Sequence, residues 1–174
     1  RAHFNDLPLP GMPAGAVAVP LADGGTDATA DLCIRSHDRH LFLADPRAAL
    51  VWEFTLFGRF VRKIPLTGFP APIGGLAFDQ RRDHLLALST GAAPAVTDFD
   101  LSGHPVAHAV LHAPVRPVSL GYDSDARVFF VPLAGGNAIG AFDVHGHLIA
   151  RYPLGPAASA SAVDAGPRSF LRLF

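Results

Sequence analysis

The chain has 174 residues, of which 49% are hydrophobic and 17% are charged, a composition that can bury a core and is unlike that of disordered proteins. Its formal net charge of −1 provides no basic surface for nucleic acid or for an anionic membrane, so we expect neither as a partner. The single cysteine excludes an internal disulfide, and no apolar run approaches the ~18 residues of a membrane span.

The first residues of the chain are similar to the end of a later repeat. The order Leu-Pro-Leu at 7–9 matches the order Ile-Pro-Leu at 64–66. We therefore expect residues 1–9 to be the tail of a preceding structural unit. Residues 10–30 are longer than the matching connection at 67–75, so we expect an inserted loop there that contains a short apolar piece.

A repeat begins after this loop. The stretch 72–103 contains three short apolar segments separated by turn residues, and each segment is too short for a helix. Its features recur in both directions along the chain at intervals of 43–45 residues. Leucines with this spacing are Leu32, Leu76 and Leu120. Phenylalanines with nearly the same spacing are Phe54, Phe99 and Phe142. A period of this length with several short strands per unit is typical of propeller blades.

The period divides the chain into three complete units, which we expect at about residues 31–74, 75–118 and 119–161. Each unit has four candidate strands joined by tight turns that contain Asp or Gly. Residues 162–174 repeat only the first two strands of a unit. The sequence therefore predicts one all-β domain: a β-propeller of four-stranded blades, with about three complete blades and partial blades at both ends.

The predicted blades must stack on one another, because no blade can cover its own apolar faces. Three arrangements meet this requirement. The chain could be a piece of a six-bladed ring, or a small ring in which its two ends join as a fourth blade. Alternatively, two or more chains could complete a ring together, which would make the protein a homo-oligomer.

Two stretches carry a resemblance to a known family. The sequence His-Leu-Phe-Leu-Ala-Asp-Pro at 40–46, followed by Leu50–Phe54, resembles the NHL repeat, in which one strand ends in Ala-Asp and the next ends in Phe before a Gly turn. Residues 137–146 are similar to the second half of that repeat. The middle unit departs from it, with Leu-Ser-Thr at 88–90. Over 31–174 the chain is similar to the six-bladed β-propeller superfamily, which includes gluconolactonase-like hydrolases and other bacterial propellers.

The resemblance implies that a ligand would bind over the mouth of the central channel. In this superfamily the mouth is formed by loops between the second and third strands and by the connections between blades. The side chains of these loops that can make several directed hydrogen bonds are those of Arg47, Arg116 and Asn137. Asp45 lies in the same loops, where we expect it to form a turn.

Three aspartates are expected beside the axis, each at the end of the first strand of a unit: Asp79, Asp123 and Asp164. Their recurrence favours a structural role in which each carboxylate caps the turn that follows its strand. Carboxylates from several blades could also converge on a divalent cation such as Ca²⁺. The Glu, Asn and Asp set of the gluconolactonase-like enzymes has no matching positions here, so no catalytic residue carries over from that family.

Three histidines are spaced four residues apart: His104, His108 and His112. This spacing would place them on one face of a helix, but the repeat places them on the outer strand of a blade. Residues four apart on a strand are separated by ~13 Å, which is too far to share one ion. We therefore expect exposed histidines rather than a metal site.

These observations favour a non-catalytic repeat scaffold, without a cofactor, that presents loops to a protein, peptide or small-molecule partner. The alternative is a metal-dependent hydrolase or lactonase of the gluconolactonase-like type, with an ion near the central channel. The chain shows no secretory signal at its start, so we expect a soluble protein whose compartment the sequence leaves undetermined.

Overall fold

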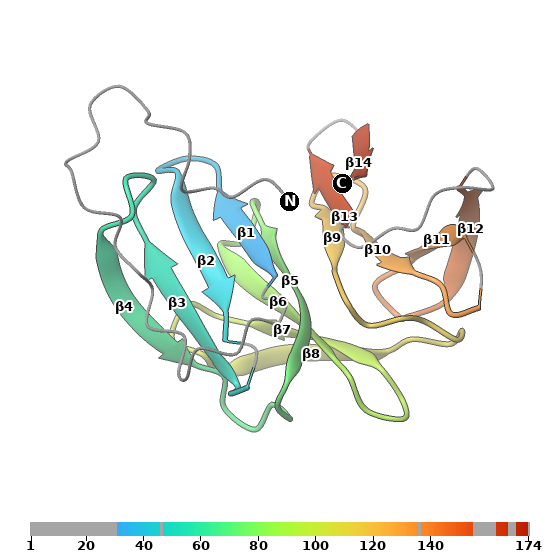
Figure 1. Ribbon diagram of the computed structural model, residues 1–174, viewed down its shortest axis with the longest axis horizontal. Coiled ribbons are helices and arrows are strands. Elements are labelled where there is room, and N and C mark those ends of the chain that lie inside the picture. Colours follow the sequence, from blue (N-terminus) through green and yellow to red (C-terminus); the bar gives the residue numbers. More distant parts are fainter. Residues whose placement is uncertain (1–30, 46, 136, 155–162, 167–169, 174) are drawn as a thin grey trace.

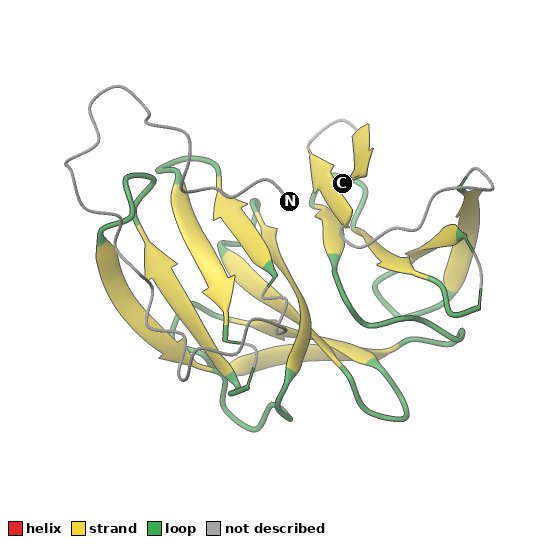
Figure 2. Cartoon of the chain, viewed as in Figure 1, coloured by secondary structure: helices red, strands yellow, loops and turns green. Residues whose placement is uncertain are grey.

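The computed structural model describes residues 31–45, 47–135, 137–154, 163–166 and 170–173. Every regular element in these residues is a β-strand (Figure 2). This part of the chain contains no helix long and apolar enough to cross a membrane. The tail expected at residues 1–9 and the loop expected at 10–30 lie outside the described residues.

Three antiparallel sheets of four strands follow one another along the chain, each with its strands in sequence order. The first sheet consists of β1 (Leu32–Arg35), β2 (His40–Ala44), β3 (Leu50–Phe54) and β4 (Phe60–Pro65). The second consists of β5 (Ile73–Asp79), β6 (His84–Ser89), β7 (Ala95–Phe99) and β8 (Pro105–Val110). The third consists of β9 (Gly121–Asp123), β10 (Val128–Pro132), β11 (Ala138–Phe142) and β12 (Leu148–Pro153). A two-stranded sheet follows, made of β13 (Val163–Gly166) and β14 (Phe170–Leu173). The predicted all-β propeller of four-stranded blades is confirmed.

The sheets fan around a common centre as the blades of a propeller (Figure 1). The first strand of each sheet lies innermost, so that β1 contacts β5, β5 contacts β9, and β9 contacts β13. The fourth strands, β4, β8 and β12, lie at the outside. Burial follows this order, because all residues of β7 are buried whereas β8 has one buried residue, Ala109. An outer strand therefore tolerates polar residues that an inner strand does not.

Apolar side chains from adjacent blades form the core. Between the first and second blades, the buried rings of Phe42 and Phe78 stack with their centroids 5.2 Å apart. Between the second and third blades, Leu88 belongs to one buried cluster with Phe129 and Phe142. Burial of each such side chain contributes about 1.5–3 kcal/mol. Each blade is thus stabilised mainly by its neighbours.

The turn between the first and second strands has the same form in all three blades. Its last residue has a positive φ in each: Arg39 (59°), Asp83 (57°) and Arg127 (58°). These residues are 44 positions apart, so the sequence period is also a period of backbone geometry.

In the same turns Gln80 joins all three blades. Its side chain accepts the N–H of Ser36 (2.8 Å) and donates to the carbonyl of Ile34 (2.6 Å), and its own N–H donates to Ser124 Oγ (2.9 Å).

The turn between the third and fourth strands brings two blades close together and requires glycine. Gly103 has a φ of 82°, and its carbonyl accepts the N–H of Thr67 from the preceding blade at 2.9 Å. A Cβ at this position would overlap the carbonyl oxygen of Pro65. Gly146 repeats both features in the third blade, where its carbonyl accepts the N–H of His112 at 2.8 Å.

We expect Gly103→Ala to destabilise the protein by at least about 2 kcal/mol more than Gly68→Ala. Gly68 also has a positive φ, 72°, but no atom lies within 4 Å of the place that its Cβ would take. Both alanines are therefore strained in the backbone, and their difference isolates the collision with Pro65. Urea unfolding of the two variants measures this difference, and equal destabilisation would contradict the close approach of the blades.

Candidate functional site

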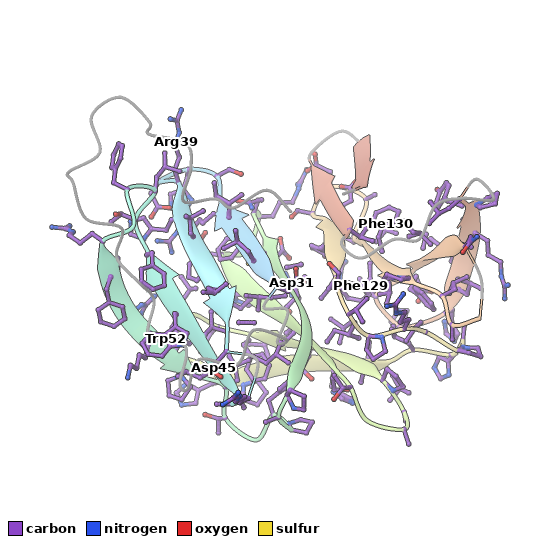
Figure 3. All side chains as sticks on the ribbon, viewed as in Figure 1. Asp31, Arg39, Asp45, Trp52, Phe129 and Phe130 are labelled. Atoms are coloured by element: carbon purple, nitrogen blue, oxygen red, sulfur yellow. The ribbon has the colours of Figure 1, made fainter. Side chains whose placement is uncertain are left out.

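A single carboxylate joins the inner strands of three blades. Asp31 lies near the centre of the fan (Figure 3). Its Oδ2 accepts hydrogen bonds from the backbone N–H of Leu76 (2.8 Å) and of Leu120 (3.2 Å), and its Oδ1 accepts one from Leu32 (3.1 Å). An inner strand is an edge of its sheet, so the N–H groups that point away from the second strand need acceptors from outside the sheet. Asp31 supplies these acceptors at the point where the inner strands converge.

Ser119 extends this contact to the partial blade. Its buried hydroxyl lies 3.3 Å from Asp31 Oδ2, to which it donates, and it accepts the N–H of Val163 at 3.1 Å. We define the axial cluster as Asp31, Ser119 and the backbone amides of Leu32, Leu76 and Leu120. Through this cluster one carboxylate and one hydroxyl connect four successive blades.

The repeat places four different residues at the axial position: Asp31, Gly75, Ser119 and Val163, each 44 residues after the previous one. Gly75 leaves space for the approach of two strands, because a Cβ there would lie 2.7 Å from the amide nitrogen of Leu120. The roles of these residues differ accordingly. Asp31 and Ser119 make side-chain hydrogen bonds between blades, and Gly75 leaves room for the neighbouring strand.

Burial raises the pKa of Asp31 from its ordinary value of 3.8 to about 6, and the hydrogen bonds from the three amides and from Ser119 oppose this shift without cancelling it. Near pH 6 the axial cluster therefore exists in two protonation states. Protonation replaces one acceptor lone pair of the carboxylate by an O–H donor, at the point where three amides and one hydroxyl donate to it.

The expected ligand-binding loops lie at the same end of the blades as the axial cluster. In an antiparallel sheet with sequential strand order, the first strand begins where the second ends, and the N–H of Ala44 at the end of β2 donates to the carbonyl of Asp31 at 2.9 Å. Asp45 follows, and its Oδ1 accepts the N–H of Arg47 (2.9 Å) and of Ala48 (3.1 Å). The prediction that Asp45 forms a turn is confirmed, and Arg47 is exposed on that turn.

Arg116 and Asn137 lie on neighbouring segments of the same end. The connection between the second and third blades runs beside the end of β10, where the N–H of Arg116 donates to the carbonyl of Pro132 at 2.7 Å. Asn137 precedes β11, and its carbonyl accepts the N–H of Leu154 at 2.5 Å. Both residues are exposed. The structure thus brings the three expected residues to one end, while their part in binding stays a prediction.

The aspartates considered as metal ligands lie elsewhere. Asp79 and Asp123 end β5 and β9, opposite the axial cluster. Oδ1 of Asp79 accepts the N–H of Arg81 and Oδ1 of Asp123 that of Asp125, both at 2.9 Å, so their capping role is confirmed. Asp164 is the second residue of β13 and not its last, so it does not share their position at the end of a strand. Among the described residues, no three His, Cys, Asp or Glu side chains are grouped to hold a metal ion.

At that opposite end, the first blade holds a buried ion network. Glu53 Oε1 lies 2.7 Å from His40 Nδ1 and 3.1 Å from Arg35 Nη2, and Glu53 Oε2 accepts a bond from Arg62 Nε at 2.6 Å. Burial opposes the ionisation of Glu53, but the hydrogen bonds from Arg62 and His40 outweigh it and hold the pKa of this carboxyl below its usual value. A carboxylate that is 2% exposed is stable only with such partners.

The second blade has a similar network with two charges exchanged. Asp98 Oδ1 lies 2.7 Å from His84 Nδ1, and Asp98 Oδ2 lies 2.7 Å from Arg82 Nη2. Arg82 also pairs with Asp79 at 2.7 Å. The equivalent positions 35 and 38 of the first blade carry these charges in the reverse order, Arg and then Asp. In both networks a buried carboxylate of the third strand lies beside the histidine of the second strand and an arginine near the end of the first, and only Glu53 has a further arginine, Arg62.

These networks were not predicted, although the spacing of His40 and His84 by 44 residues was a visible signal. In the third blade three of the corresponding positions are apolar, Ala126, Val128 and Ala141, and the fourth is Asp123, which accepts the N–H of Asp125 in its own turn. Each carboxylate in the networks lies beside an arginine of its own blade. We therefore assign them to the stability of the first two blades and not to a site.

Neither the comparison with protein-family models nor the comparison with curated proteins gave a match. Solved structures with a similar fold include a protein of unknown function from Bacteroides caccae, with a TM-score of 0.57 and 12% identity over 84% of this chain and 53% of that chain. Another is the hydrazine synthase of Kuenenia stuttgartiensis, with a TM-score of 0.56 and 12% identity over 89% of this chain and 44% of that chain. The chain spans about half the length of these proteins, and the likeness concerns the fold alone.

We expect Asp31 to make the protein more stable at acid than at neutral pH. A group whose pKa is raised in the folded chain adds stability that is complete below pH 3.8 and is lost as the pH rises through about 6. A shift of about two units corresponds to about 3 kcal/mol. Because Asp31→Asn removes this titration, the stability of the variant relative to the unmodified protein should increase by about that amount between about pH 4 and pH 7. Urea unfolding at both pH values measures it, and parallel pH profiles would refute it.

We expect the charges at positions 35 and 38 to be exchangeable as a pair. Arg35→Asp alone places a second carboxylate beside Glu53 and should cost at least about 3 kcal/mol. Adding Asp38→Arg reproduces the order found in the second blade, so the double variant should recover about half of that loss or more. A double-mutant cycle by urea unfolding gives the coupling. Additive losses would show that the two networks are not interchangeable.

Proposed function

We propose that the chain is a non-catalytic repeat scaffold that binds a protein, peptide or small-molecule partner with the loops around the axial cluster. The main support for this proposal is that the loops at this end combine a hydrogen-bonded backbone with exposed polar side chains. The turn that carries Arg47 is capped by Asp45, and the segment that carries Arg116 is bonded to Pro132. A partner that binds such loops does not have to order them, which reduces the entropy lost on binding.

The side chains of these loops favour a partner that is rich in acceptor oxygens. The guanidinium groups of Arg47 and Arg116 can each donate to both oxygens of a carboxylate, and the amide of Asn137 can donate and accept. We therefore propose an acidic peptide or an acidic segment of a protein as the best match. Such a partner would place its carboxylates over the loops and leave the buried axial cluster untouched.

We further propose that the blades are related to NHL repeats. The support is the Ala-Asp order at the end of β2, where Asp45 forms the turn that follows the strand. The hydrolase alternative has less support among the described residues. Asp79 and Asp123 already accept turn amides with Oδ1, and Asp79 also pairs with Arg82.

Binding of a fluorescent oligoglutamate peptide tests the proposed site. We expect saturable binding, which Arg116→Ala should weaken about ten-fold, or about 1.4 kcal/mol. Arg59→Ala is the matched control, because Arg59 is also exposed but lies on the turn between β3 and β4 at the other end of the first blade. Fluorescence anisotropy gives both affinities. The proposal is wrong if binding does not saturate or if both variants weaken it equally.

A further inference from the structure

The first blade has an open face where the other blades have a neighbour. Leu32 and Ile34 on its inner strand are 52% and 41% exposed. Their equivalents in the next two blades are at most 4% exposed: Leu76, Phe78, Leu120 and Tyr122. Leu56 on its outer turn is 39% exposed, whereas the equivalent Leu101 packs against the core shared with the preceding blade. The first blade therefore presents an apolar face of the kind that a preceding blade covers.

Gly58 marks the place where the outer strand of that neighbour would lie. It is equivalent to Gly103 and Gly146, and its φ of 76° is similar to theirs. The carbonyls of those two glycines each accept an N–H from the segment just after the preceding outer strand, and a Cβ on either would overlap the carbonyl of the last residue of that strand. At Gly58 no atom of the described residues lies within 4 Å of a Cβ, and none of these residues donates to its carbonyl. The turn thus has the conformation that accommodates a neighbour, but the described residues supply none.

The chain contains a segment with the residues for this place. The sequence Val-Pro-Leu-Ala at 19–22 has the same order of aliphatic residue, proline, leucine and small residue as Ile-Pro-Leu-Thr at 64–67. The two stretches are 45 residues apart, and so are Gly58 and Gly103. In the later stretch the carbonyl of Pro65 faces Gly103, the N–H of Thr67 donates to it, and Leu66 between them is 3% exposed. Pro20, Leu21 and Ala22 have the matching positions.

The length of the following connection agrees with this assignment. In the described blades, the leucine after the outer strand precedes the axial position by eight or nine residues: Leu66 to Gly75, Leu111 to Ser119, and Leu154 to Val163. Leu21 precedes Asp31 by ten residues, whereas Leu9 precedes it by 22. An outer strand that ends near residue 22 therefore needs no inserted loop. An outer strand at 7–9 needs a long one.

We propose that residues 16–22 of this chain dock on the open face of the first blade as the outer strand of a preceding blade. Ala22 would donate its N–H to the carbonyl of Gly58, and Leu21 would be buried beside the turn that contains Leu56. This assignment replaces the inserted loop expected at 10–30 with a regular connection between blades. It concerns a different surface from the loops with Arg116, so it does not depend on the proposed binding function.

Hydrogen exchange of the full-length chain tests the docking. The amides of residues 21–22 should exchange at least about ten-fold more slowly than those of an unstructured peptide. Leu21→Asn should abolish this protection, whereas the matched variant Leu9→Asn should leave it unchanged. Loss of protection with Leu9→Asn alone would place the outer strand at 7–9 and overturn the proposal. Protection that disappears on dilution would mean that a second copy covers the face, which also overturns it.

Gly58→Ala gives a second measurement that does not depend on the choice of leucine. If Pro20 lies against this turn, the new Cβ overlaps its carbonyl, and the melting temperature should fall further than with Gly68→Ala. Gly68 has a similar positive φ and open surroundings, so the control has the same backbone strain. Exchange at residues 21–22 should accelerate at least about ten-fold in Gly58→Ala only. Equal melting temperatures and unchanged exchange would refute the docking.

Discussion

Contact between neighbouring blades is the constraint on which every other feature of this structure depends. A strand of about five residues cannot build a core by itself, and the buried clusters all combine side chains from adjacent sheets. Hydrophobic contact is not directional, so it does not fix the angle between two blades. That angle is fixed by directed contacts at three places: Asp31 at the axis, Gln80 at the inner turns and Gly103 at the outer turns.

This arrangement gives most of the buried carboxylates partners inside the scaffold. The carboxylates at the turn end of the inner strands accept amides of the following turns, and the carboxylates around Glu53 and Asp98 each lie beside an arginine of the same blade. At the axial end, Asp31 is committed to the backbone of three blades. The arginine and asparagine side chains of the loops are exposed. A scaffold whose buried carboxylates are paired internally can vary such loops without loss of the fold.

The period in the sequence predicted the strands and their grouping, because apolar and turn positions are both determined locally. It even predicted that Asp79 caps its turn, since the partners are amides two and three residues away. It did not predict the axial cluster, because the partners of Asp31 are backbone amides, which every residue carries. It did not predict the ion networks either. Arg35 and Asp79 occupy equivalent positions but carry opposite charges, so the repeat does not show that they belong to equivalent networks in the two blades.

The axis is the place where copies of a repeat cannot remain alike. Equivalent residues converge there, and a Cβ at Gly75 would collide with the backbone of Ser119 and Leu120 in the next blade, so that position admits only glycine. Two carboxylates placed side by side at the axis would repel each other, because the environment there is poorly solvated. One carboxylate with several amide donors, beside a hydroxyl such as that of Ser119, avoids this repulsion and still satisfies the converging strands. Convergence itself therefore makes the centre of the propeller chemically distinct from every blade that forms it.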